Sequence, residues 1–406
     1  MKSPRPKLHR NVWVASATSF LTDVSSEMVF DLLPLFLSNV LGARTAAIGL
    51  IEGAAEAVSS FLKVASGFLS DVAGRRKWLA VAGYGISAAS KPLLFLASSW
   101  GAVLSIRTLD RLGKGVRSAP RDALLAESVP PGARGLAFGL HRAFDSGGAV
   151  AGILLALVIV WWAQGDSLDL APETYRLLIM ASILPAIASV AVLALGAREV
   201  SSARARGASR PRLSFRGLDP PFLRFLLAVL LFTLGNSSDS FLVLRASERG
   251  LSVAGILGML LAFNVVYTLV AAPAGHLSDT WGPKPIIAFG WLFYSILYFG
   301  FALAGEAWHV VALFTLYGVY YGLVEGVARA FVADLVTDEG KLGTSYGLYH
   351  AVVGAAALPA SLIAGILWQG LGEFSGLGPR APFFFGAALA LAATALLATV
   401  PGPKPS

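Results

Sequence analysis

Long apolar stretches follow one another along almost the whole chain, separated by short polar connections. A helix that crosses a bilayer needs about 20 mostly apolar residues, because the hydrocarbon is about 30 Å thick. The pattern therefore predicts twelve membrane-spanning helices, over residues 12–38, 47–70, 78–98, 101–124, 135–162, 177–197, 222–246, 252–277, 284–304, 307–331, 342–369 and 381–400. The stretches are continuous rather than alternating, which disfavours a β-barrel. The expected fold is an all-α integral membrane protein.

The basic residues of the short connections predict the orientation in the membrane. If both termini are cytoplasmic, the inside connections hold 17 Lys and Arg residues and the outside connections hold 4. Cytoplasmic loops of membrane proteins carry such an excess of positive charge. We therefore expect both termini in the cytoplasm and the chain in a bacterial-type cytoplasmic (inner) membrane. The first span is expected to be a retained helix rather than a signal peptide, since too few apolar residues precede Ala15-Ser16-Ala17.

Composition excludes several classes of protein. Charged residues make up 14% of the chain, whereas a soluble domain carries about 25%. The absence of cysteine removes disulfides, thiolate metal sites and cysteine nucleophiles. We find no phosphate-binding loop and no His pair at metal-ligand spacing, so we expect no catalytic residues, no metal and no cofactor. The net charge of +8 is explained by cytoplasmic loops in contact with the lipid bilayer, and no nucleic-acid partner is expected.

The chain contains an internal repeat at a constant spacing. The segment Gly67–Asp71 (GFLSD) recurs as Gly275–Asp279 (GHLSD), and Gly135–Leu140 (GLAFGL) recurs as Gly343–Leu348 (GTSYGL), both at an offset of 208 residues. Each repeat contains six expected spans, so both keep the same orientation. Parallel repeats of this kind are typical of transporters that bind substrate between two halves.

The repeat predicts the domain organisation. We expect two pseudo-symmetric six-helix bundles, over residues 1–197 and 222–406, joined by a cytoplasmic basic linker over residues 198–221. The linker contains six Arg residues together with Ser, Gly and Pro, a composition that suits an exposed connection near anionic headgroups.

The loop after the second expected span resembles the signature of the major facilitator superfamily. It reads Gly67-x-Leu69-x-Asp71-x-x-Gly74-Arg75-Arg76-Lys77, and the segment Asp110–Asp122 (DRLGKGVRSAPRD) resembles a prokaryotic subgroup of that superfamily. The resemblance covers essentially the whole chain. It implies alternating access about a central cavity. It also implies a cytoplasmic gate formed by Asp71, Gly74, Arg75, Arg76 and the repeat copy Asp279. We expect a monomer, because the glycine motifs of the spans are a weak dimer signal.

Charged residues inside the expected spans are costly, at about 2.5–3.5 kcal/mol for each ionised side chain at the bilayer centre. In the first span Asp23, Glu27 and Asp31 recur at i, i+4 and i+8, which places them on one helix face. The fourth span carries cations at i, i+4 and i+7 on one face. We predict a buried ionic ladder that pairs Asp31 with Arg107, Glu27 with Arg111 and Asp23 with Lys114, with Glu56, Lys63 and Asp145 nearby.

Two interpretations of the ladder remain open. It could hold helices together through satisfied ion pairs. Alternatively, one acid exchanges its partner for a proton or a substrate. Seven acids and six bases lie in the spans of the first half, and a desolvated carboxylate without a cationic partner can carry a proton reversibly. Asp23 and Glu27 are the leading candidates.

The second half offers polar and aromatic side chains instead. Asn236 and Asp239 lie in the seventh span, and Tyr317, Tyr321 and Glu325 share one face of the tenth at i, i+4 and i+8. Such a face suits an organic molecule, and ordinary helix packing is the alternative. We expect these five residues to line the substrate cavity.

These observations predict a secondary active transporter that moves a small solute by alternating access. Proton coupling is expected, and export is favoured over import. Two alternatives remain. An inorganic cation or a metal chelate could be transported, because hard carboxylates cluster in the first half. A non-transporting membrane receptor could also be built on this scaffold.

Overall fold

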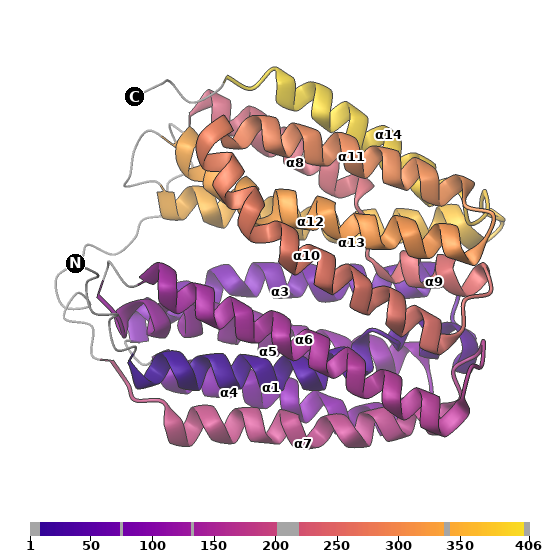
Figure 1. The fold of residues 1–406 in the computed structure, drawn as a ribbon, viewed down its shortest axis with the longest axis horizontal. Helices are drawn as coiled ribbons and strands as arrows, with labels where there is room; N and C mark the ends of the chain where they lie inside the picture. The colour runs from indigo at the N-terminus through magenta and orange to yellow at the C-terminus, as the bar shows by residue number, and fades with distance from the viewer. Residues whose placement is uncertain (1–8, 74–75, 131–133, 201–218, 337–341, 402–406) are drawn as a thin grey trace. The chain divides into compact units, whose positions relative to one another are not determined.

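A computed structural model describes residues 9–73, 76–130, 134–200, 219–336 and 342–401. These residues form helices, with a single isolated β-bridge between Leu371 and Phe374. The helices are α1 (Arg10–Phe30), α2 (Leu33–Leu35), α3 (Thr45–Ala73), α4 (Arg76–Leu93), α5 (Trp100–Glu127), α6 (Arg134–Gln164), α7 (Pro172–Gly196), α8 (Pro220–Gly235), α9 (Ser240–Glu248), α10 (Val253–Trp281), α11 (Pro283–Leu303), α12 (Ala307–Leu335), α13 (Leu342–Gln369) and α14 (Ala381–Ala398) (Figure 1). A π-helix over Phe36–Val40 follows α2, and a 3₁₀ turn over Leu94–Leu96 follows α4.

The expected all-α membrane fold is confirmed. Among the described residues, ten helices are long and apolar enough to cross a membrane. The expected spans 12–38 and 101–124 are absent from those ten, although helices α1 and α5 occupy them. Both helices carry several charged residues, and these make them less apolar than the others.

Two expected spans are interrupted in the structure, which corrects the prediction of continuous helices there. Helix α1 ends at Phe30, four residues before Pro34. Proline has no N–H to bond back to residue i−4, and its ring clashes with that carbonyl. The expected span 222–246 is divided into α8 and α9 by the polar segment Asn236–Asp239.

The described residues group into two compact units. Unit 1 comprises those in Met1–Leu33, Val58–Ala163 and Pro172–Arg210, and unit 2 comprises those in Pro34–Ala57, Gln164–Ala171 and Pro211–Ser406. The domain boundaries at residues 197 and 222 stay a prediction. Most of the expected linker, residues 201–218, lies outside the described part of the chain.

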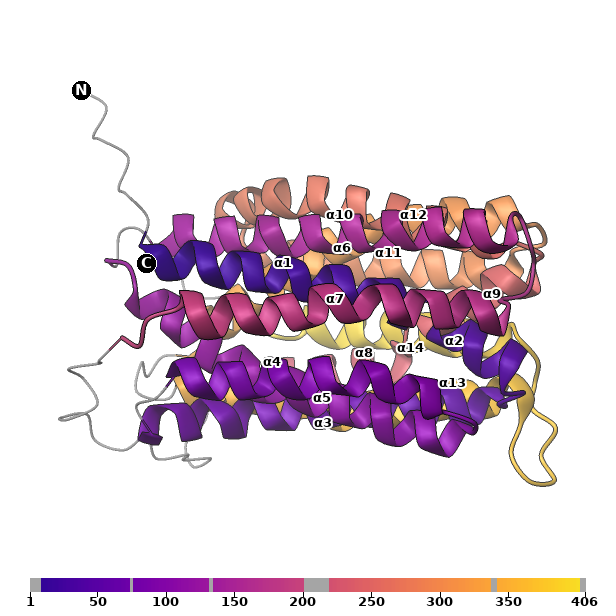
Figure 2. The same cartoon turned by 90° about the horizontal axis from the view of Figure 1, so that it is seen from below.

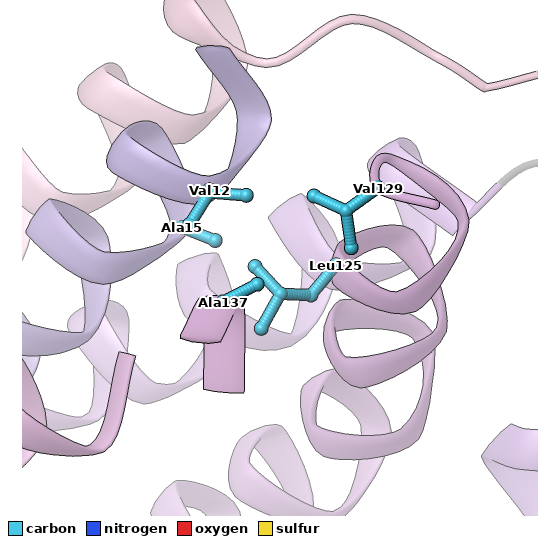
Figure 3. Packing of buried hydrophobic residues seen from close by; sticks show 5 residues of the cluster. All are labelled: Val12, Ala15, Leu125, Val129 and Ala137. Atoms are coloured by element: carbon cyan, nitrogen blue, oxygen red, sulfur yellow. The ribbon is translucent and has the colours of Figure 1, made fainter. Parts of the chain in front are cut away.

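Unit 1 is built on contacts of α1 with α7 and of α4 with α5 and α7, and α1 and α7 run side by side in Figure 2. Its core includes a cluster of Val12, Ala15, Leu125, Val129 and Ala137, all of them buried (Figure 3). Small and branched apolar side chains from α1, α5 and α6 meet there, so the ends of three helices are held together by close packing.

A buried polar side chain also holds unit 1 together. Asn11 donates to Ser128 Oγ and to the carbonyl of Arg198, each at 2.9 Å, and accepts from the backbone N–H of Arg198. The start of α1 is thereby fixed to the ends of α5 and α7.

Unit 2 is built around α11, which contacts α12 and α14, while α8 contacts α13 and α14. In Figure 1 the helices α8, α11 and α14 lie next to one another. The first half of α3 also belongs to this unit and packs directly against the backbone of α13. Thr45 donates to the carbonyl of Gly365 at 2.8 Å, and a Cβ at Gly53 would lie 2.7 Å from Leu358 Cα.

Candidate functional site

Two carboxyl groups meet between α1 and α6 in unit 1. The side chains of Asp23 and Asp145 lie close enough to interact directly, and both residues are half-buried. Asp145 also accepts from Ser19 Oγ at 2.6 Å and from Arg142 Nη1 at 3.2 Å. Two ionised carboxylates side by side repel each other, whereas a proton on one of them removes this repulsion and lets it donate to the other. The pair is therefore a site at which a proton can reside.

Glycine residues allow this approach of the two helices. A Cβ at Gly148 would lie 2.8 Å from Phe20 Cα, and a Cβ at Gly152 would lie 2.7 Å from the carbonyl oxygen of Val24. The two glycines stand four residues apart on α6, so one face of that helix contacts the α1 backbone directly. Small residues at such spacing let membrane helices approach closely.

A second buried charge network lies between α4 and α5. Asp110 is buried together with Lys91, Arg107 and Arg117, and Arg107 Nη1 lies 3.8 Å from Asp110 Oδ2. Arg117 Nη1 donates to Ser87 Oγ at 2.7 Å, and Ser87 Oγ donates to the Asp110 carbonyl at 2.9 Å. Several cations thus share one carboxylate, an arrangement that fixes both helices because an unpaired buried charge is costly.

The predicted ladder residues all lie in or directly after these helices and are buried or half-buried: Asp23, Glu27 and Asp31 in and after α1, Glu56 and Lys63 on α3, Arg107, Arg111 and Lys114 on α5, and Asp145 on α6. Lys114 and Glu27 lie within electrostatic range of Asp23. The guanidinium of Arg107 also lies over the ring of Phe30, 4.1 Å from its centre. The three predicted pairs between α1 and α5 stay predictions.

The predicted cavity residues of unit 2 gather at the break between α8 and α9. Asp239 accepts from the hydroxyl of Tyr317 at 3.1 Å and from that of Tyr321 at 3.2 Å. The Asn236 N–H bonds back to the carbonyls of Phe232 and Thr233, which ends α8. The break thus presents a carboxylate and an amide to two tyrosines of α12.

Aromatic rings surround this carboxylate. The ring of Tyr321 lies 5.2 Å from that of Tyr317, 5.4 Å from that of Phe263 and 6.2 Å from that of Tyr267, in edge-to-face geometry each time. Tyr294 adds a hydroxyl that donates to the Gly235 carbonyl at 3.1 Å. The arrangement combines a polar centre with apolar walls, which is the usual composition of a small-molecule site.

Glu325, the remaining predicted cavity residue, has its own partners. It accepts from Tyr267 Oη at 2.6 Å and from Arg329 Nη2 at 2.7 Å. Its charge is therefore balanced by a guanidinium, unlike that of Asp239, for which the described residues provide no ion pair.

The predicted gate falls mostly outside the described residues. Gly74 and Arg75 are not described, and neither are the side chains of Asp71 and Asp279. Arg76 pairs with Glu127 at 2.8 Å, and the N–H groups of Arg76 and Lys77 donate to Glu199 at 2.8 and 3.1 Å. A carboxylate at a helix start is favoured by the macrodipole, so Glu199 fixes the first turn of α4.

Sequence reasoning did not single out Asp110 or Tyr294 as members of a site. Tyr294 and Tyr298 stand at i and i+4 on α11, and this spacing was the available signal. In the part of the chain that the structure describes, no three His, Asp or Glu side chains form a group that could hold a metal ion.

The apolar helices of spanning length, together with carboxylates and cations buried between them, define a multi-pass membrane protein with a polar interior. The family model described as Major Facilitator Superfamily matches residues 15–266 and 240–406. The chain belongs to this superfamily, and it is a membrane transporter.

Individual relatives agree with this membership. An MFS-type transporter of Methanocaldococcus jannaschii is 34% identical over 397 residues, which cover 96% of this chain and 95% of that protein. The multidrug resistance protein MdtG of Serratia proteamaculans is 25% identical over 334 residues, 79% of either chain. Among solved structures, the nucleoside transporter NupG has a TM-score of 0.79 at 10% identity, with 96% of this chain and 99% of that chain covered. A bacterial homologue of the lysosomal transporter Spinster has a TM-score of 0.77 at 16% identity, with 96% of each chain covered.

Proposed function

We propose that this transporter is a proton-coupled secondary transporter that moves a small organic solute by alternating access, with export as the favoured direction. The observation that carries the proposal is the close approach of the Asp23 and Asp145 carboxyl groups. Loss of the shared proton leaves two like charges side by side, and this repulsion favours separation of α1 from α6. A proton held or released here can thus bias a conformational equilibrium, which is the requirement for coupling.

The solute site is assigned to the cluster of unit 2. Asn236, Asp239, Tyr317 and Tyr321 converge on the break between α8 and α9, and Glu325 lies on the same helix as the tyrosines. A break in a membrane helix exposes backbone and polar side chains where they line a cavity. The cluster supplies a carboxylate, hydroxyls and ring faces, groups that suit an organic solute better than an inorganic ion.

The remaining parts of the proposal concern topology. Both termini and the loop that contains Arg76 are placed in the cytoplasm, in a bacterial-type inner membrane, because basic residues concentrate on that side. Domains over residues 1–197 and 222–406, joined by the linker 198–221, act as a monomer. The gate residues Asp71, Gly74, Arg75, Arg76 and Asp279 close the cytoplasmic side.

Reconstitution tests this function. A thermal-shift screen of the purified protein against metabolites, antibiotics and metal salts identifies a solute, because a ligand that binds the folded state raises its Tm. Proteoliposomes are then loaded with that solute, and its flux is measured with and without a pH gradient. Flux that responds to the gradient supports the proposal. Flux that is identical at every gradient removes proton coupling, and tight binding without any flux favours a receptor.

A further inference from the structure

Asp239 is an acid whose partners among the described residues are not cations. Its hydrogen-bond partners are the neutral hydroxyls of Tyr317 and Tyr321, and Glu52, another acid, lies within electrostatic range of it. In the described part of the chain Asp239 makes no ion pair. The site is therefore electronegative before any ligand arrives.

The helix break does not supply a compensating cation. Asp239 stands between the carboxyl end of α8 at Gly235 and the amino end of α9 at Ser240. The partial charges of these two helix ends have opposite signs, so the full charge of the carboxylate determines the sign of the potential. An anionic solute would be repelled, and a neutral solute would leave the carboxylate without a counter-charge.

The aromatic walls suit a cation of organic size. Tyr321, Phe263 and Tyr267 are half-buried, so parts of their rings are not covered by protein. Tyr321 meets Phe263 at an interplanar angle of 87° and Tyr267 at 83°, so the ring faces point in different directions and form a corner. The face of an aromatic ring is electron-rich and attracts ammonium groups.

We propose, on the basis of the proposed function, that the solute of this site is an organic cation, with an ammonium or other onium centre bound by Asp239 and by the ring faces of Tyr321, Phe263 and Tyr267. The carboxylate supplies the charge selectivity, and the rings supply apolar contact. Glu325 is a weaker candidate for the same role, since Arg329 already neutralises it at 2.7 Å.

Binding of two probes of similar shape and opposite charge tests this selectivity. Full-length protein in detergent is titrated with tetraphenylphosphonium and with tetraphenylborate, and each Kd is measured by equilibrium dialysis. We expect the cation to bind at least about tenfold more tightly than the anion, the ratio that corresponds to a modest charge–charge interaction. Equal affinity for the two probes, or tighter binding of the anion, would overturn the inference.

Variants locate the binding to the carboxylate. Asp239→Asn keeps the hydrogen-bond acceptor and removes the charge, so the affinity for the cation should fall at least about tenfold. Asp239→Glu should restore much of it. The exposed Glu373 provides the control, because Glu373→Gln removes an equal charge outside the site. Unchanged cation affinity in Asp239→Asn would contradict the inference.

The rings give a second measurement that does not depend on folding of the Asp239 variant. Tyr321→Phe keeps the ring and should retain cation binding, whereas Tyr321→Leu should weaken it by about threefold or more. Equal binding by these two variants counts against the aromatic contribution. Cation binding without flux in proteoliposomes would leave this inference standing and remove the transport function. Flux of a neutral or anionic solute without cation binding would overturn this inference and leave the transport function standing.

Discussion

Asp23 on α1 and Asp145 on α6 bring two carboxyl groups close together, and Ser19 and Arg142 donate to the carboxylate of Asp145. Because Asp145 already has these two donors, we propose that Asp23 is the carboxyl group that holds the proton. In the proposed mechanism the pair alternates between a protonated state, in which the helices are held together, and a doubly ionised state, in which they repel.

Neutral variants of this pair should uncouple transport from the proton gradient. In Asp23→Asn the amide N–H₂ still donates to Asp145 but cannot release a proton. A pH gradient of about one unit can drive about tenfold accumulation per coupled proton, and this accumulation should fall to simple equilibration in the variant. The infrared absorption of the protonated carboxyl group should disappear at the same time.

The exposed Asp166 supplies the control for this experiment. Asp166→Asn should retain both the accumulation and the infrared band. Full accumulation in Asp23→Asn and in Asp145→Asn would show that the coupled proton is carried elsewhere.

The close approach of Asp23 and Asp145 should depend on the glycine face of α6, formed by Gly148 and Gly152. A Cβ at Gly152 would lie 2.7 Å from the Val24 carbonyl oxygen and 3.0 Å from Val24 Cα, and neither backbone atom can move without shifting the helix. Gly152→Val should therefore destabilise the protein by about 1–3 kcal/mol and weaken proton coupling. Measurement of Tm and of pH-driven flux checks both effects.

The matched control is Gly139→Val on the same helix, because a Cβ at Gly139 has open space around it. A Gly152→Val protein with the Tm and the coupling of the parent would show that close contact of α1 and α6 is dispensable.

Spacing along the sequence predicts which residues share a helix face, but it does not identify their partners on other helices. The i, i+4, i+8 series of Asp23, Glu27 and Asp31 predicted an inward face, and these residues are half-buried in the structure. It could not show that Asp23 meets Asp145, because that contact depends on where Gly148 and Gly152 let α6 approach α1. Contacts between helices depend on how the helices pack and how each is rotated about its axis. The residue spacing within one helix does not determine either.

The interruption of the seventh span illustrates a second limit. Residues 222–246 are apolar enough to suggest one continuous helix, yet Asn236-Ser237-Ser238-Asp239 separates α8 from α9. Asn, Ser and Asp side chains compete with helical hydrogen bonds by bonding to the nearby backbone, so four in succession after Gly235 were a usable signal. Hydropathy averages over this segment and hides it.

The stability of unit 2 should depend on Arg245. This fully buried side chain donates to the carbonyls of Phe301, Ala302 and Ala304 at 3.1–3.2 Å. These carbonyls lie at the end of α11, where the helix leaves its last acceptors without intrahelical partners. Arg245→Met should therefore lower the free energy of unfolding by about 2–4 kcal/mol, since several charge-assisted hydrogen bonds are lost.

Denaturation in mixed micelles, followed by circular dichroism, measures this change. Arg249→Met is the control, because Arg249 lies near the same loop with a longer contact of 3.4 Å to Gly305 and should cost about 1 kcal/mol or less. Equal losses in the two variants would mean that the cap on α11 contributes little.

The contact between the first half of α3 and α13 should open during transport. The backbone N–H of Thr45 donates to Gln369 Oε1 at 2.9 Å, and its hydroxyl donates to the Gly365 carbonyl at 2.8 Å. Thr45 belongs to the proposed domain 1–197 and Gln369 to the proposed domain 222–406, so access that alternates by movement of these domains separates this contact in one of the two states. The chain has no cysteine, so Thr45→Cys with Gln369→Cys creates a unique pair that a short bis-thiosulfonate reagent can bridge.

Cross-linking of the double variant should reduce flux to the level of empty liposomes, and a reducing agent should restore it. Each single-cysteine variant treated with the same reagent provides the control, since a modification at one position leaves the helices free to separate. A loss of flux in the single variants would mark simple blockage of the site. Continued flux in a fully cross-linked protein would show that α3 and α13 stay together throughout the cycle, and it would contradict an alternating mechanism that opens along this contact.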